Sequence, residues 1–290
     1  MTDSTKKKRR SQRPIAVTWR RLKKNKLATL GLIVILIMIF LAIIAPEIMP
    51  YKIDALDLKN KLQGPSSTHW LGTDELGRDI LSRLLYGSRF SLEIGIIGVL
   101  VSAGGGIVIG AIAGYFGGTT DNIVMRIMDV LQAMPGIVLA IAISATLGPG
   151  LVNCIIALSI SAIPNYARMT RASILNVRKM EYLEAAASIN CSNLRIIVKH
   201  VLPNALSPLI VQSTMGIAGT IMNAAMLSFI GLGVQPPTPE WGAMLSAGRG
   251  YLRDYPHLCL FPGITIMITV LSLNMLGDGL RDALDPKLKD

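Results

Sequence analysis

The sequence contains few charged and few aromatic residues. Of its 290 residues, 16% are charged and 5% are aromatic, whereas 51% are hydrophobic. Soluble globular domains carry about 25% charged residues, because their surfaces face water. The composition therefore excludes an ordinary soluble protein and indicates an integral membrane protein.

Cysteine and histidine are scarce as well, with three of each in the chain. Cys154, Cys191 and Cys259 are too widely spaced to match a disulfide framework or a zinc motif. The histidines are equally scattered. We therefore expect no metal site and no disulfide framework in this chain.

Catalytic motifs are missing from the sequence. It contains no Gly-Lys dipeptide, so a phosphate-binding loop followed by its lysine is excluded, and the chain is not expected to hydrolyse ATP itself. It also contains no His-Glu-x-x-His, no Gly-x-Ser-x-Gly and no Cys/His cluster. A transport subunit is favoured over an enzyme. The alternative, a membrane enzyme that acts on lipid or peptide, is supported only by scattered Ser, His and Asp residues.

Ionisable residues are rare inside the apolar segments. Arg126 and Asp129, three residues apart, are expected to form a structural ion pair at the inner end of a helix rather than a proton relay. An ion-coupled carrier needs a carboxylate nearer the middle of the membrane. The pattern therefore disfavours a stand-alone carrier.

Long apolar runs dominate the rest of the chain. The first, 27–48, would span about 33 Å as a helix, which is too long for the core of a cleavable signal and long enough to cross a bilayer. We predict an all-α integral membrane protein with six transmembrane helices. The other five runs are 91–116, 123–147, 151–167, 206–234 and 258–276.

Basic residues are unevenly distributed between the segments that join these helices. The chain has a net charge of +11, and 11 of its 29 Lys and Arg residues precede Leu27. With both termini inside, 21 of the 29 lie on the cytoplasmic side, as the positive-inside rule requires. The positive charge is thus a signal of orientation in a membrane lipid bilayer, and it does not indicate a nucleic-acid partner.

The second predicted span carries a small residue at every fourth position. Small residues let helix backbones approach closely in lipid. Two interpretations stay open: packing within the bundle, or an interface with a second membrane subunit. The residues are Gly98, Ser102, Gly106, Gly110 and Gly114.

The segment before that span is amphipathic. In "DELGRDILSRLLYGSRFSL" the residues Leu76, Ile80 and Leu84 share one helical face, and Arg78 and Arg83 lie on the other. We expect a helix that lies flat on the outer membrane surface or packs over the mouth of the bundle.

A polar hairpin is predicted on the cytoplasmic side. Residues 170–189 contain neither Gly nor Pro and favour a helix that ends at Asn190, a residue that tolerates the left-handed conformation. Ser192 is a candidate N-cap for a second helix, 193–202, which Pro203 is expected to stop. The run of small side chains after Glu184 is suited to close docking of another protein.

These residues resemble a known family. The sequence "EAAASIN", followed by Pro203, resembles the Glu-Ala-Ala loop of ABC importer permeases, with Asn190 at a position where the family has Gly. Four further stretches resemble the C-type subunit of dipeptide, oligopeptide and nickel permeases. They are "HWLGTDELGRDILSRLLYGSRFSL", "AGYFGG", "LSFIGLGVQPPTPEWGAML" and "NMLGDGLRDALDPKLKD", and the resemblance runs from about residue 25 to the end of the chain.

The resemblance implies a type I ABC importer permease fold in a bacterial or archaeal cell (inner) membrane. It assigns Glu184, Ala185, Ala186, Asn190 and Pro203 to the element that couples the chain to ATPase subunits. It implies a B-type permease subunit, two ATPase subunits and an extracytoplasmic solute-binding protein as partners. No cofactor is implied on this chain, because ATP and Mg belong to the ATPase subunits.

Small peptides are the implied solute, with nickel or another small solute as the alternative. Because the binding protein does most of the selecting in this family, the lack of clustered His and Cys does not decide between them. The predicted division is 1–26 for a basic cytoplasmic segment, 27–49 for the first transmembrane helix, 50–90 for an extracytoplasmic segment with the amphipathic helix, 91–280 for the permease core with the coupling loop at about 168–204, and 281–290 for a cytoplasmic tail.

Overall fold

The computed structural model describes residues 14–183 and 190–284, and every named element within them is a helix. Five helical stretches are long and apolar enough to cross a membrane, and a bent helix pair provides a sixth. Six spans were predicted from the apolar runs. The five stretches are α2 (Lys26–Ile48), α3 (Ile80–Phe116), α6 (Leu151–Val177), the path Asn193–Phe229 and α11 (His257–Leu284), and the pair is α4 (Gly118–Leu131) with α5 (Gly136–Leu147).

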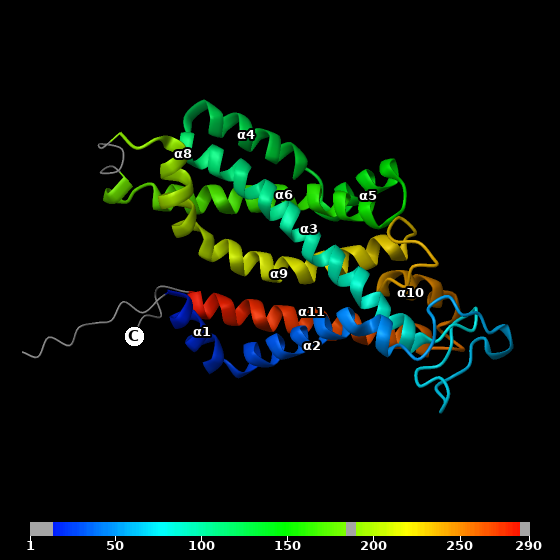
Figure 1. The fold of residues 1–290 in the computed structure, drawn as a ribbon. Helices are drawn as coiled ribbons and strands as arrows, with labels where there is room; N and C mark the ends of the chain where they lie inside the picture. The colour runs from blue at the N-terminus through cyan, green and yellow to red at the C-terminus, as the bar shows by residue number, and fades with distance from the viewer. Residues whose placement is uncertain (1–13, 184–189, 285–290) are drawn as a thin grey trace, which may run out of the picture.

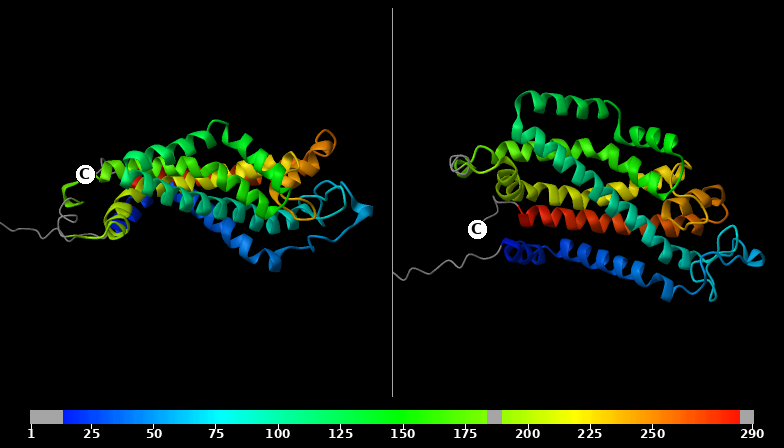
Figure 2. Two further views of the ribbon diagram at one scale, coloured as in Figure 1. Left: turned by 90° about the horizontal axis from the view of Figure 1, so that it is seen from above. Right: turned by 45° about the horizontal axis from the view of Figure 1, so that its top comes forward.

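The helices lie side by side in one curved slab (Figures 1 and 2). Helix α3 crosses the slab against α6 and α9 (Leu202–Phe229), while α11 lies between α9 and α2 (Figure 1). Helices α1 (Pro14–Lys24) and α8 (Asn193–Ile196) lie at the same end of the bundle as the last turn of α11 (Figure 1). We call this the basic end.

The opposite end is closed by a structure that we call the cap, residues 50–79 and 230–256. It contains the short helical turn Leu58–Asn60, the helix α10 (Trp241–Gly248) and the turn Arg249–Tyr251. In Figure 1 the two cap segments lie next to each other although they are far apart in the sequence. Arg83, in the first turns of α3, makes hydrogen bonds to both cap segments.

Helix α3 is longer than predicted. It runs unbroken for 37 residues from Ile80, so the predicted boundary at residues 90 and 91 falls inside it. The amphipathic segment is therefore not a separate helix on the membrane surface. Its apolar residues Ile80 and Leu84 are buried against Trp241 and Met244 of α10, so of the two predicted placements the segment takes the one that packs over the end of the bundle.

The third span is broken. The run 123–147 was predicted as one transmembrane helix, but α4 and α5 are separate helices and the chain bends by 78° between them. Pro135 occupies the N-cap of α5. Proline has no backbone N–H, and it disfavours helical geometry in the residue before it, so the break falls at residues 132–135.

Two predictions about the polar hairpin are wrong. The predicted helix 170–189 does not exist as one unit, because α6 continues from the membrane to Val177 and the chain then turns. Pro203 does not stop a helix either. It lies in the first turn of α9, and the chain stays helical on both sides of it, because a π-helical turn, Ile197–Val201, joins α8 to α9.

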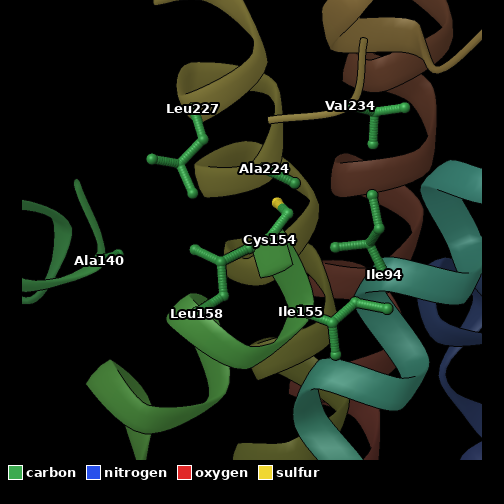
Figure 3. Close-up of a cluster of buried hydrophobic side chains, with 8 residues drawn as sticks. All are labelled: Ile94, Ala140, Cys154, Ile155, Leu158, Ala224, Leu227 and Val234. Carbon is green, nitrogen blue, oxygen red and sulfur yellow. The ribbon is translucent and has the colours of Figure 1, made fainter. Parts of the chain in front are cut away.

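The core near the cap draws on four helices, as Figure 3 shows. Cys154 of α6 is fully buried there, and Ile94 of α3 and Leu227 of α9 pack around it. Because α3, α6 and α9 share this apolar cluster, the cap rests on a well-packed base. The cluster consists of Ile94, Ala140, Cys154, Ile155, Leu158, Ala224, Leu227 and Val234.

Candidate functional site

Asn190 makes the sharp turn that was predicted for it. Its φ is 57°, in the left-handed region that side-chain-bearing residues rarely adopt. Asn is one of the few residues other than Gly that tolerates this region. The prediction of a left-handed turn is therefore confirmed. Three other predicted coupling residues, Glu184, Ala185 and Ala186, lie outside the described residues.

Ser192 takes the N-cap position of α8, as predicted, with an extended backbone (φ −62°, ψ 143°). Its side chain makes no capping hydrogen bond. Instead its carbonyl accepts the N–H of Ile196 at 3.0 Å. The turn at the start of α8 is thus held by backbone geometry rather than by the serine hydroxyl.

An apolar cluster anchors this turn to the membrane helices. The cluster consists of Ala111 of α3, Ile174 and Val177 of α6, Leu183, Ile196 of α8, Val201 of the π-helical turn and Ala205 of α9. The Tyr115 hydroxyl of α3 also donates to Asn193 Oδ1 at 2.9 Å. The segment that contains Asn190 is therefore joined to α3, α6 and α9 at once.

The small residues of α3 pack inside the bundle. A Cβ added at Gly110 would lie 2.7 Å from the Cβ of Thr170 on α6, and one at Gly114 would lie 3.1 Å from the carbonyl oxygen of Arg171. Gly106 meets Tyr166 even more closely. Of the two interpretations of the stripe, the contacts within this chain match packing within the bundle.

The other two stripe residues are buried too. The Ser159 hydroxyl of α6 donates to the carbonyl of Gly98 at 3.2 Å, which links the two helices directly. Ser102 donates to the carbonyl of Val99 within α3 at 3.2 Å. Side chains on these faces would separate α3 from α6, because the contacts are already at van der Waals distance.

Asp79 organises the start of α3 in the cap. Its carboxylate accepts the backbone N–H of Ser82 at 2.8 Å and the Ser82 hydroxyl at 2.7 Å, which caps the helix. The same carboxylate lies 2.9 Å from Nδ1 of His69, whose ring packs on Tyr51. These contacts fasten the loop 50–79 to the bundle.

Arg83 and Glu240 connect the two halves of the cap. Arg83 donates to the carbonyl oxygens of Ile53 at 3.1 Å and Pro237 at 3.3 Å, so one guanidinium spans both cap segments. Glu240 caps α10 by accepting the N–H groups of residues 242 and 243, both at 2.8 Å. It also accepts the Ser91 hydroxyl at 3.1 Å. The cap is therefore a hydrogen-bonded assembly rather than a loose loop.

Three polar contacts cross the seam between α4 and α6, and we call them the polar ladder. Arg171 Nε lies 2.5 Å from Asp121, Arg168 lies 2.7 Å from Asp129, and Gln132 donates to Asn165 Oδ1 at 2.6 Å. The predicted ion pair between Asp129 and Arg126 is thus wrong, since Asp129 pairs with α6 instead.

The described residues contain no cluster suited to a metal ion. In residues 14–183 and 190–284, no three His, Cys, Asp or Glu side chains come together in a way that could hold a metal ion. What the arrangement provides is a bundle of spans, a bonded cap at one end and an anchored turn at the other. These are the parts of a membrane conduit.

Comparison with known families decides between kinds of conduit. A family model described as the binding-protein-dependent transport system inner membrane component matches residues 106–290. A second, described as the N-terminal TM domain of oligopeptide transport permease C, matches residues 13–65. The chain belongs to the family of binding-protein-dependent inner-membrane permeases. As a member, this permease is the non-catalytic membrane component of an ABC importer, and ATP is bound by the importer's ATPase subunits.

Relatives cover almost the whole permease. A dipeptide transport system permease protein from Alkalihalophilus pseudofirmus is 48% identical over 95% of this chain and 91% of its own length. A glutathione transport system permease protein from Pectobacterium atrosepticum is 47% identical over 93% of this chain and 90% of its own length.

A solved structure has the same fold. A chain of the MetNI methionine ABC transporter, in an inward-facing conformation, superposes with a TM-score of 0.57. The two sequences are 19% identical, and the superposition covers 70% of this permease and 96% of the MetNI chain. The likeness confirms the ABC importer permease fold that the sequence predicted.

The sequence analysis missed the polar ladder and the bonding within the cap. The spacing of Asp79 and Ser82 is a capping signal that could have placed the start of α3. The ladder partners are 33 to 50 residues apart in the sequence. No local pattern reveals such pairs, because only the packing of α4 on α6 brings them together.

Proposed function

We propose that this permease forms, with a second, B-type permease subunit, the membrane path of an importer for small peptides. The observation that carries the proposal is near-complete alignment, at 47–48% identity, with permeases named for dipeptide and for glutathione transport. Both named solutes contain peptide bonds. Dipeptides and short peptides of similar size are the common class.

The basic end is proposed to face the cytoplasm and to receive an ATPase subunit. Its support is the excess of Lys and Arg in the segments at that end. The coupling loop, about 168–204, contains Glu184, Ala185 and Ala186, and it turns back at Asn190. The cap, at the opposite end, then faces the solute-binding protein outside the membrane.

The proposed mechanism uses the anchoring of the coupling loop. Closure of the two ATPase subunits on ATP displaces the loop, and the apolar cluster at its base passes the displacement to α3, α6 and α9 together. The bundle then alternates between openings on the two sides of the membrane. This chain transmits the displacement to the membrane helices and forms part of the solute path, and it breaks no covalent bond.

The test is reconstitution of the complete importer in liposomes with its cognate binding protein. We expect ATP-dependent uptake of a labelled dipeptide that exceeds uptake of nickel ion under the same conditions. The control is the same complex with both ATPase sites disabled by substitution. Dipeptide uptake that continues undiminished in this control would show that the chain is not an ATP-driven permease.

A further inference from the structure

Two of the three rungs of the polar ladder, Asp129–Arg168 and Gln132–Asn165, lie well inside the length of the bundle. Asp129 follows Gly118 by 11 residues and Asn165 precedes Val177 by 12, so they are about 16–18 Å along their helices from the basic end. Yet these two rungs are open to their surroundings. The side chains of Asp129 and Arg168 are 48% and 45% exposed.

The opposite face of α4 is apolar at the same levels. Ile123, Ile127 and Val130 follow the i, i+4, i+7 spacing of one helical face and are 58%, 54% and 71% exposed. A helix immersed in water would not present such a face. One side of α4 therefore contacts lipid or protein while the other carries charge.

Lipid is the wrong environment for the charged side. On insertion scales an Asp or Arg at the centre of a membrane helix costs about 2.5–3.5 kcal/mol. Ionisable residues within spans accordingly face a bundle interior or a water-filled cavity. For Asp129 and Arg168, which the described part of the chain leaves half exposed, a water-filled space satisfies this requirement.

The broken backbone next to the ladder points the same way. Residues 132–135 between α4 and α5 are not helical, and Ala133, Met134 and Pro135 are exposed. Irregular backbone at membrane depth occurs only where protein buries it or where it lines a water-filled cavity. Gln132, in this break, is also the last rung of the ladder.

We propose that the polar ladder and the break at 132–135 line the water-filled solute path on this chain. The inference rests on the proposed function and adds the residues that meet the solute. Asp129 and Arg168 offer opposite charges to the ammonium and carboxylate ends of a peptide. Gln132 and Asn165 each offer a donor and an acceptor to its amide groups.

The test measures water at these positions with a charged, membrane-impermeant thiol reagent. The starting chain has Cys191 and Cys259 replaced by Ser, and Cys154 stays because it is fully buried. Path positions are Gln132→Cys and Asn165→Cys. Ser161→Cys, one turn further along the same face of α6, is nearly isosteric and retains the packing if the other two disturb it.

Matched controls are Ile127→Cys and Val130→Cys on the apolar face of α4. The complete importer in liposomes is used, with and without ATP. Path cysteines are expected to react at least about tenfold faster than the control cysteines. A thiol in water forms the reactive thiolate more readily than one in lipid, and a difference of about one pKa unit changes the thiolate fraction tenfold. A lipid-soluble maleimide should label both sets.

Equal rates at path and control positions in every nucleotide state would overturn the inference. So would path cysteines that react in the isolated chain but never in the complete importer, because a partner subunit would then cover the ladder. Peptide uptake is measured on the same liposomes. Normal uptake with unreactive path cysteines rejects only this inference, whereas loss of ATP-driven uptake in the starting chain rejects the proposed function.

Discussion

Replacement of Asn190 by Val should uncouple ATP hydrolysis from transport. The backbone at Asn190 has φ 57°, where a residue with a Cβ is strained by about 1–2 kcal/mol, and a β-branched residue by more. A penalty of that size lowers the population of the turned conformation by a factor of about 5–30. Solute imported per ATP hydrolysed should therefore fall by about 5- to 30-fold.

The assay measures dipeptide uptake and phosphate release together in liposomes that contain the complete importer. Asn190→Gly should couple normally, because Gly adopts positive φ without strain. Ser192→Val is the matched control, since its extended backbone accepts Val and its side chain makes no capping bond. Equal coupling ratios in the Gly and Val variants of Asn190 would refute the reasoning.

Three further predictions concern docking, packing and the cap. Glu184→Lys should reduce the ATPase subunits that co-purify with the chain while its amount in the membrane stays constant; unchanged co-purification with normal coupled transport would contradict the assigned docking role. Gly110→Leu should destabilise the chain by about 1–3 kcal/mol through overpacking against α6, measured as a lower thermal midpoint, whereas Gly104→Leu, with open space around it, should not; similar midpoints for the two would argue against the close α3–α6 contact. Glu240→Ala should lower the free energy of unfolding by about 0.5–2 kcal/mol, because α10 loses the hydrogen bonds of its N-cap residue, and Glu240→Gln should retain more of the stability; a thermal midpoint unchanged in both variants would show that the hydrogen bonds of Glu240 contribute little.

The number of spans was predictable because the thickness of a bilayer sets the length of an apolar run. The ends of the helices were not, because polar residues continue a helix wherever protein contacts satisfy them. Arg83 illustrates this, since it is buried at the start of α3 by bonds to the carbonyls of Ile53 and Pro237, which are 30 and 154 residues away in the sequence. A hydropathy pattern reflects the charge of such a residue and not the hydrogen bonds that it makes in the folded chain.

The two prolines of the middle region show a second limit. Pro135 ends up in a break of 78°, whereas Pro203 lies in the first turn of a helix and interrupts nothing. Pro203 was predicted to stop a helix, whereas Pro135 lies inside a run that was predicted as one span. Which position a proline takes relative to a helix start depends on the neighbouring helices. Asn190 was predictable because its constraint is local to one residue.

The contact between α3 and α6 also determines where the bundle can bend. Gly106, Gly110 and Gly114 bring the two helices to backbone contact, so this face of α3 contributes no side chains that could slide or change rotamer. We therefore expect the pair to move as one rigid unit, 37 residues long on its longer side. Deformation during transport is then confined to joints outside this unit, such as the turn at Gly117 that ends α3 and the break at 132–135.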